Sequence, residues 1–369
     1  MDNYEGIYIH VPFCRYKFPY CDFYSVTSKE SMLDRYTAET IRRIREATPL
    51  NLSADTVYFG GGTPSLLGGG RIAAITEALG QCVNISGDAE ITVEANPASD
   101  LSEFLEGCAS AGINRLSLGM QSALKQELSA IGRRHTPDDV LNAMEKSHSV
   151  GIDNISLDLM LGIPMQTANS LEYSLRFIES AAPTHVSAYM LKIEEGTPFH
   201  RIRYALDIAD DDALADMYEQ TFDRLEKAGY AQYEISNAAK PGAESRHNLK
   251  YWNCDQYIGI GPSAHGFING RRYYYDRSLD GYLCGAAAHD DGEGGDMEEY
   301  IMMRLRLSEG LTEDGMKKRF GAGIPGPIRK RASASVMSPY CVCDGHGIHL
   351  TRKGMLISNA IICSFIELL

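Results

Sequence analysis

The sequence predicts an α/β fold: a partial (βα)6-type TIM barrel followed by a small C-terminal α+β domain. In the first half of the chain, six short runs rich in β-branched residues alternate with longer amphipathic stretches. Such alternation indicates parallel strands joined by right-handed crossovers. Beyond Leu191 the alternation stops, which marks the end of the barrel units. A doubly wound sheet would give a similar pattern, so it remains the alternative.

The six barrel strands are expected at residues 6–10, 56–59, 90–94, 115–118, 154–159 and 185–191. Residues 31–45 and 137–150 are amphipathic and predict two of the crossover helices. Six such units suit a barrel or partial barrel.

The remaining third of the chain is predicted from its change of pattern. Residues 211–229 indicate a helix, and the acidic, Gly-rich stretch 290–296 has the composition of a flexible linker. A helix is expected over 297–307, and a small hairpin and helix over 345–359. We therefore expect a core at 1–236, a connecting segment at 237–295 and a C-terminal domain at 296–369.

Composition narrows the class of protein. The chain has 369 residues, 44% of them hydrophobic, with a formal net charge of −14. The acidic balance argues against nonspecific nucleic-acid binding, which depends on Lys and Arg at phosphates. No apolar run approaches the roughly 20 residues that cross a bilayer, and the N-terminus does not resemble a signal peptide. A cytoplasmic location is expected, with membrane contact at most peripheral.

Unusual side chains follow the predicted strands, at the end where barrel sites form. Cys14 and Cys21 lie in the first loop, and three glycines, residues 60–62, follow the second strand. Consecutive glycines let backbone N–H groups approach a ligand, although many such turns are only tight connections.

Two carboxylates belong to the same series. Glu94 ends the third strand, where it could accept both hydroxyls of a ribose or merely cap a helix. Asp158 interrupts an apolar run, and a carboxylate there must be paired or face a polar pocket.

Several segments of the sequence resemble those of a known family. Residues 8–14, 60–64, 94–97, 117–122, 132–136 and 158–164, and further motifs near the C-terminus, resemble the radical S-adenosylmethionine (SAM) superfamily. The branch most similar is oxygen-independent coproporphyrinogen III oxidase and its HemW-type heme-chaperone relatives. The resemblance implies SAM contacts at Tyr8, Gly61, Gly62, Thr63, Glu94, Gln121, Arg133 and Asp158, with Arg134 the alternative to Arg133.

One residue breaks the family's cluster motif, Cys-x3-Cys-x2-Cys, whose three thiolates hold a [4Fe–4S] cluster. Cys14 and Cys21 stand at the outer positions, but Phe18 occupies the middle one. A phenyl ring has no lone pair for iron, so this ligation is broken as written.

Three interpretations of Phe18 remain open. The chain is a degenerate member without radical chemistry, or Phe18 is a mutation or a sequence error in an otherwise normal member. Alternatively, Cys254, Asp22 or an external thiol completes the site. A zinc site from Cys14, Cys21 and His10 is conceivable, although its spacing matches no standard zinc motif.

A second motif separates the two branches. Residues 247–252 read His-Asn-Leu-Lys-Tyr-Trp and match the HemW-type heme motif His-Asn-x-x-Tyr-Trp, and Phe23 stands where the oxidase has a further cysteine. His247 could bind iron through a neutral imidazole, and Tyr251 and Trp252 could pack on the macrocycle. The alternative is an aromatic loop on the barrel with a surface histidine.

The resemblance implies a heme chaperone that passes heme to an unknown acceptor, with SAM and a [4Fe–4S] cluster as family cofactors. The alternatives are a SAM-dependent oxidoreductase of porphyrin biosynthesis and a cluster-free SAM or heme binder. Whether the chain is an enzyme depends on the cluster.

Overall fold

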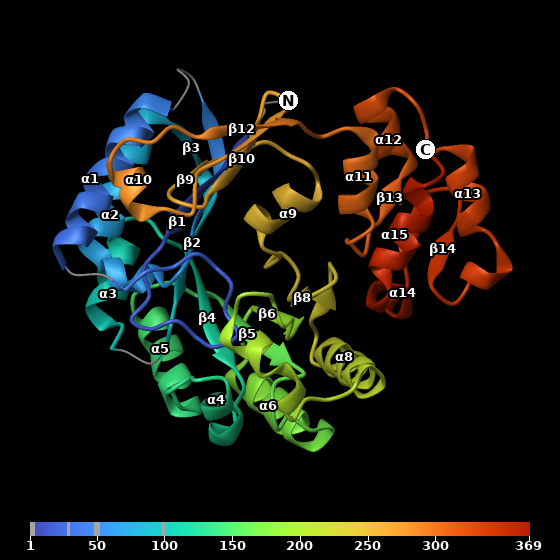
Figure 1. Cartoon of the computed structure of the whole chain (residues 1–369), viewed down its shortest axis with the longest axis horizontal. Helices are drawn as coiled ribbons and strands as arrows, with labels where there is room; N and C mark the ends of the chain where they lie inside the picture. Colours follow the sequence, from blue (N-terminus) through green and yellow to red (C-terminus); the bar gives the residue numbers. More distant parts are fainter. Residues whose placement is uncertain (1–3, 28–29, 48–51, 98–99) are drawn as a thin grey trace.

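The computed structural model describes residues 4–27, 30–47, 52–97 and 100–369, which build a 12-stranded sheet (Figure 1). The strand order is β12-β11-β10-β9-β1-β2-β3-β4-β5-β6-β8-β7. Strands β1 to β6 are parallel and lie side by side in chain order. A doubly wound sheet would reverse that order at one point. The predicted partial (βα)6 barrel is therefore confirmed.

All six predicted strands are present, and β3 extends furthest beyond its prediction. The central strands are β1 (Glu5–Val11), β2 (Ser53–Gly61), β3 (Asn84–Ala95), β4 (Arg115–Gln121), β5 (Asn154–Leu161) and β6 (His185–Met190). Every residue of β4 is buried, as expected for a strand whose sheet is covered on both faces.

Helices cover the outer face of the sheet (Figure 1). They are α1 (Glu30–Ala47), α2 (Gly69–Cys82), α3 (Ser102–Ser110), α4 (Lys125–Ala130), α5 (Pro137–Ser149) and α6 (Ala168–Ala181), with a 3₁₀ turn η1 (Pro64–Leu67). Helix α5 begins where the sequence dictates: Thr136 and Asp139 form a reciprocal capping box, and Pro137 occupies the first turn.

After β6 the chain turns back along one edge of the sheet. The elements are α7 (Pro198–Arg201), η2 (Arg203–Ala205), α8 (Asp211–Lys227), β7 (Ala231–Gln232), β8 (Asn237–Ala239) and α9 (Arg246–Trp252). Strand β8 pairs antiparallel with β6, and α8 confirms the helix predicted there.

The opposite edge of the sheet is built from the segment that follows α9. It comprises β9 (Tyr257–Ile260), β10 (His265–Ile268), β11 (Arg271–Tyr274), α10 (Leu279–Leu283) and β12 (His289–Glu293). Strand β9 lies parallel to β1. The prediction of a flexible linker at 290–296 is wrong, because β12 pairs with β11 and Asp290 forms an ion pair with Arg271.

The C-terminal region forms a smaller unit beside the barrel (Figure 1). Its elements are α11 (Met297–Arg304), β13 (Leu311–Thr312), α12 (Glu313–Phe320), α13 (Gly326–Ala332), η3 (Ser335–Met337), β14 (Cys341–Cys343), β15 (Gly347–Leu350), α14 (Arg352–Leu356) and α15 (Ser358–Ile366). The expected hairpin is present, but β15 pairs with β14, which begins earlier than predicted. The domain boundaries at 236 and 295 stay a prediction.

One hydrophobic core runs from the barrel into this unit. Arg352 of α14 pairs with Asp223 and Glu226 of α8 across the junction. Among the described residues, no helix has the length and apolar character needed to cross a membrane.

Candidate functional site

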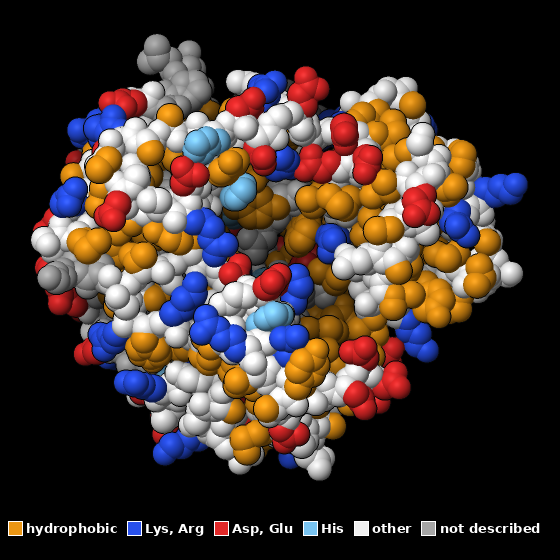
Figure 2. Space-filling model, viewed as in Figure 1, with side chains coloured by type: hydrophobic (Ala, Val, Ile, Leu, Met, Phe, Trp, Pro, Cys, Tyr) orange, Lys and Arg blue, Asp and Glu red, His pale blue; other side chains and the backbone are white. Residues whose placement is uncertain are grey.

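A cavity of about 530 Å³ occupies the interior of the barrel. It extends from Cys14 and Cys21, in the loop after β1, to Asn248 on α9. The space-filling view shows a hollow near the middle of this face, with Lys and Arg side chains along its rim (Figure 2). The cavity lining includes ten of the residues singled out in the sequence: Cys14, Phe18, Cys21, Gly61, Gly62, Thr63, Glu94, Gln121, Arg133 and Asp158.

Glu94 lies deep in this cavity. Its carboxylate accepts hydrogen bonds from the Tyr58 hydroxyl at 2.8 Å and from the Gly61 N–H at 3.3 Å. Burial, helped by the nearby charge of Asp158, raises the pKa of Glu94 to about 7. Glu94 can therefore accept hydroxyl donors of a ligand, and does so best above neutral pH.

Asp158 lines the same cavity from β5. In the described part of the chain it accepts one hydrogen bond, from the Ser117 hydroxyl at 3.2 Å. Burial raises the pKa of Asp158 to about 6, against the opposing charges of Arg133 and Arg115. A buried carboxylate with one donor has lone pairs available for a ligand.

The end of β2 requires glycines because neighbouring residues lie too close to its backbone to leave room for a Cβ atom. Gly61 has φ +109°, and a Cβ there would lie 2.5 Å from Cε1 of His10. A Cβ on Gly62 would lie 2.6 Å from the carbonyl oxygen of Phe13. These glycines let the β2 turn pack directly against the loop that carries Cys14, which contacts Thr63 at 3.5 Å.

Gln121 carries a backbone signal that the sequence does not show. Its φ is +63°, a conformation that costs energy for a residue with a side chain. The side chain accepts a hydrogen bond from the Tyr189 hydroxyl at 2.9 Å. Backbone strain beside a cavity is typical of a functional position.

Tyr8 does not line the cavity with the other residues implied for SAM. Its hydroxyl donates to Nδ1 of His10 at 3.0 Å, and Nε2 of His10 donates to the carbonyl of Tyr24 at 3.1 Å. This places Tyr8 behind the site, where it orients His10 beneath Gly61.

The cluster loop contains an aromatic ring where the family has a thiolate. Phe18 is 8% exposed and packs among aromatic and Arg side chains. Among the described residues, no group of three or more His, Cys, Asp or Glu side chains could hold a metal ion. Cys14 and Cys21 alone do not satisfy an iron–sulfur cluster, so the loop does not fit the family's metal group.

The alternative ligands are only partly supported. Cys254 lies in a separate pocket beyond α9 and is absent from the cavity lining. Asp22 does line the cavity, where it lies 3.6 Å from Arg277. Both ring nitrogens of His10 are hydrogen-bonded, which opposes the zinc alternative.

The residues of the second motif lie at the other end of the barrel, on α9. His247 is fully buried; Nδ1 hydrogen-bonds to Oγ1 of Thr56 at 2.9 Å and Nε2 to the Tyr251 hydroxyl at 2.8 Å. Its ring stacks on Tyr58 with centroids 5.3 Å apart. Burial lowers the pKa of His247 to about 3. The interpretation of a surface histidine is wrong, because α9 closes the floor of the barrel.

The two aromatic residues of this motif differ in their surroundings. Tyr251 packs edge-on against Tyr257 and holds His247. Trp252 is partly exposed; its buried Nε1 has no hydrogen-bond partner in the described part of the chain, and Arg306 lies 5.9 Å from its ring.

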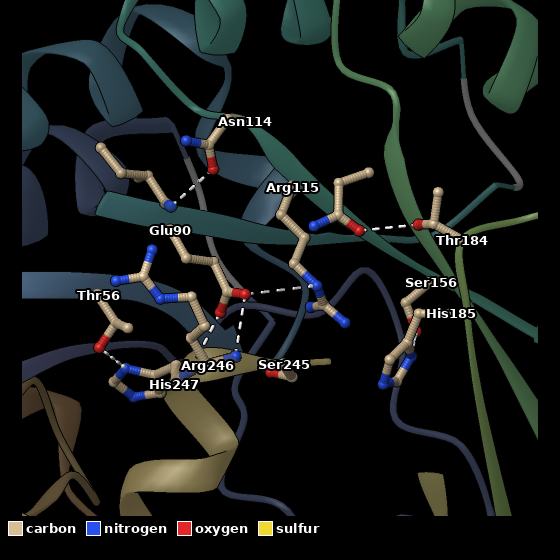
Figure 3. A network of polar contacts seen from close by, with 12 residues as sticks. Thr56, Glu90, Asn114, Arg115, Ser156, Thr184, His185, Ser245, Arg246 and His247 are labelled. Atoms are coloured by element: carbon tan, nitrogen blue, oxygen red, sulfur yellow. Dashed lines mark hydrogen bonds and ion pairs between the residues drawn. The ribbon is translucent and has the colours of Figure 1, made fainter. Parts of the chain in front are cut away.

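Two charged residues at the floor were missed by the sequence reasoning. Glu90 accepts the backbone N–H groups of Arg246 and His247 at 3.0 and 3.1 Å, and so caps α9 from a neighbouring strand (Figure 3). The Arg115 side chain, 2% exposed, lies 4.0 Å from Glu90. Both residues begin predicted strands, at 90 and 115, but a charged residue at the start of a strand is not specific enough to mark a functional position.

The fold and the cavity define the general class of the protein. Residues 8–178 match the radical SAM superfamily. The structure superposes on Escherichia coli coproporphyrinogen III oxidase, HemN, a radical SAM enzyme, with a TM-score of 0.84. That match has 20% sequence identity and covers 100% of this chain and 91% of HemN, so it shows a shared fold. The protein is thus built as a radical SAM barrel.

Relatives of higher identity define the family. The heme chaperone HemW of Mycobacterium tuberculosis is 37% identical, over 97% of this chain and 93% of the relative. HemW of Escherichia coli is 38% identical, over 86% of this chain and 90% of the relative. The chain belongs to the HemW heme-chaperone family of the radical SAM superfamily.

Proposed function

We propose that this protein binds heme and passes it to an acceptor protein. The observation that carries the proposal is the similarity to heme chaperones along 97% of the chain. The acceptor is a protein still to be identified, and the proposed cytoplasmic location rests on the sequence alone.

His247 is the proposed axial ligand of the heme iron. Its low pKa keeps the imidazole neutral across the physiological range, so no proton competes with iron. Coordination requires Thr56 or Tyr251 to release a ring nitrogen. We therefore propose that α9 moves away from the barrel floor when heme binds, and that Tyr251 and Trp252 then contact the macrocycle.

The test is a hemin titration followed by the Soret band, with apomyoglobin added afterwards as a heme acceptor. We expect His247→Gln to lose the histidine-ligated spectrum and the transfer. His185→Gln is the matched control, because His185 is equally buried and also has both ring nitrogens bonded, to Ser156 and Tyr233. Equal loss in both variants would contradict a specific role for His247.

A SAM-cleaving oxidoreductase is the second candidate, and Phe18 opposes it. The cavity itself suits SAM, since its carboxylates can accept ribose hydroxyls and Gly61, Gly62 and Thr63 line it beside them. We propose that SAM is contacted by Gly61, Gly62, Thr63, Glu94, Gln121, Arg133 and Asp158, with Tyr8 behind them.

Anaerobic iron–sulfur reconstitution of the natural chain beside Phe18→Cys separates the two candidates. We expect only Phe18→Cys to acquire about four irons, the content of one [4Fe–4S] cluster. Equal iron and sulfide in both proteins, with the same EPR signal after reduction, would restore the oxidoreductase.

A further inference from the structure

The loop after β1 contains an aromatic cluster centred on Phe18. The ring of Phe18 stacks parallel to Tyr20, with centroids 5.7 Å apart and 10° between the planes. It meets Tyr16 edge-on at 5.2 Å. Such pairs are favourable beyond the apolar area that they bury.

Arg133 closes this cluster from the connection between α4 and α5. Its guanidinium carbon lies 3.9 Å from the centre of the Phe18 ring. Nε and Nη2 of Arg133 donate to the Tyr20 hydroxyl at 3.1 and 2.8 Å. One guanidinium is therefore held by a cation–π contact and two hydrogen bonds at once.

The backbone of the loop is also anchored by protein contacts. Phe13 forms a parallel bridge with Val26, and the Phe199 N–H donates to the carbonyl of Pro19 at 3.0 Å. The Cys21 N–H donates to the carbonyl of Phe18 at 3.1 Å and closes a turn. Gly132, at φ +77°, lets the next segment approach Pro19 closely.

We infer that this stack of Tyr16, Phe18, Tyr20 and Arg133 replaces the iron–sulfur cluster as the element that shapes the loop, so that the cavity binds an adenine nucleoside thioether without iron. In a cluster-bearing relative, the three thiolates fix the loop through metal. Here the same segment is fixed by ring and guanidinium contacts, and the Phe18 ring occupies the position of the middle cysteine ligand.

The ligand class follows from what remains of the cavity. Glu94, Asp158 and the glycines at the end of β2 belong to strands and turns that need no metal for their geometry. They serve the nucleoside end of a ligand. With no iron to chelate an amino-acid end, affinity comes from that nucleoside end, so S-adenosylhomocysteine and 5′-methylthioadenosine bind with similar strength.

The experiment uses the full chain purified with a chelator and verified free of iron. Hydrogen exchange of the loop, residues 13–26, is followed by mass spectrometry, and the two thioethers are titrated by calorimetry. Phe18→Leu removes the ring but keeps an apolar side chain. Phe104→Leu, at a similarly buried phenylalanine of α3, is the matched control.

We expect the iron-free natural chain and Phe104→Leu to protect the loop and to bind both thioethers within threefold of each other. Phe18→Leu should exchange at least tenfold faster in the loop and bind at least tenfold more weakly. The inference fails if the iron-free natural chain exchanges as fast as Phe18→Leu, or if thioether binding needs iron. If Phe18→Leu does not fold, loop exchange and thioether binding of the natural chain, measured with and without iron, still test the inference.

The inference is independent of heme carriage, because Phe18 and His247 lie at opposite ends of the barrel. A hemin titration of the same iron-free sample reports on the proposed function alone.

Discussion

Toward the carboxyl ends of the strands, Glu94 and Asp158 face a cavity and, among the described residues, have only one or two protein hydrogen bonds each. At the amino ends, Glu90 and His247 are buried more completely, and each of their polar atoms has a protein partner. The end of the barrel at the carboxyl ends of the strands, the upper end, is therefore arranged to receive a ligand. At the opposite end, the floor, the polar atoms of Glu90 and His247 are already hydrogen-bonded, so this end must open before it can bind a ligand.

This difference shows that residue type alone does not define a binding site. A carboxylate raised in pKa by burial, with vacant lone pairs, is poised for a ligand. The same group with two backbone N–H donors is a structural cap.

The largest effect is expected at the floor, from Glu90→Ala. The substitution removes the acceptor of two α9 N–H groups and leaves buried Arg115 without the carboxylate that lies 4.0 Å from it. Breaking a buried pair in this way costs about 3–5 kcal/mol. Urea unfolding should show this loss, while Asp88→Ala, at an exposed acid 3.8 Å from Arg246, should leave stability unchanged. A small loss of unfolding free energy for Glu90→Ala would mean that Glu90 does not hold α9 at the barrel floor.

Acidification should weaken the floor through His247. Its folded-state pKa is about 3, below the ordinary value of 6.5, so the unfolded chain takes up the proton between these values. The stabilising contribution is complete above pH 6.5 and is lost as the pH falls toward 3. Between pH 7 and pH 5, the natural chain should lose about 2 kcal/mol of unfolding free energy relative to His247→Gln. If the difference in unfolding free energy between the two proteins does not change with pH, the His247 imidazole is not buried away from solvent protons.

At the upper end, Arg133→Met should cost about 1.5 kcal/mol, the sum expected for a partly buried cation–π contact and its hydrogen bonds. Arg134→Met is the control, because exposed Arg134 lies only over Tyr16, at 4.8 Å. Thermal or urea unfolding measures both variants. Equal effects would show that the stack is not centred on Phe18.

The smallest effect concerns ligand affinity. The pKa of Glu94 is about 7, so this carboxyl is protonated below neutral pH and accepts ribose hydroxyls poorly. Affinity for S-adenosylhomocysteine should fall about tenfold between pH 8 and pH 6. In Glu94→Gln, which cannot ionise, binding should be weak and independent of pH over that range. A pH-dependent Glu94→Gln variant would assign the titration to another group.

Much of the fold was accessible from sequence. The six β-branched runs and the helices at 137–150 and 211–229 were predictable because hydrophobic periodicity and capping residues are local properties. The strand-end placement of Gly61 and Glu94 followed from parallel topology alone, whereas Asp158 lies within β5 and was singled out because it interrupts an apolar run. The strand at 289–293 was missed because its acidic, Gly-rich composition is that of a linker, and pairing with β11 overrides composition.

By itself, the sequence determined the β–α alternation, the family and the broken cluster motif, since each depends on the identity and spacing of residues. The strand order that separates a barrel from a doubly wound sheet came from the tertiary structure. Only the tertiary structure decided what those residues face. Burial of His247 beneath Tyr58, and its cap at Glu90, arise where α9 packs against strands more than 150 residues away in the chain. The stack of Arg133 on Phe18 joins segments 115 residues apart through ring and guanidinium contacts. No local pattern encodes such encounters, because they depend on how strands and loops meet in space.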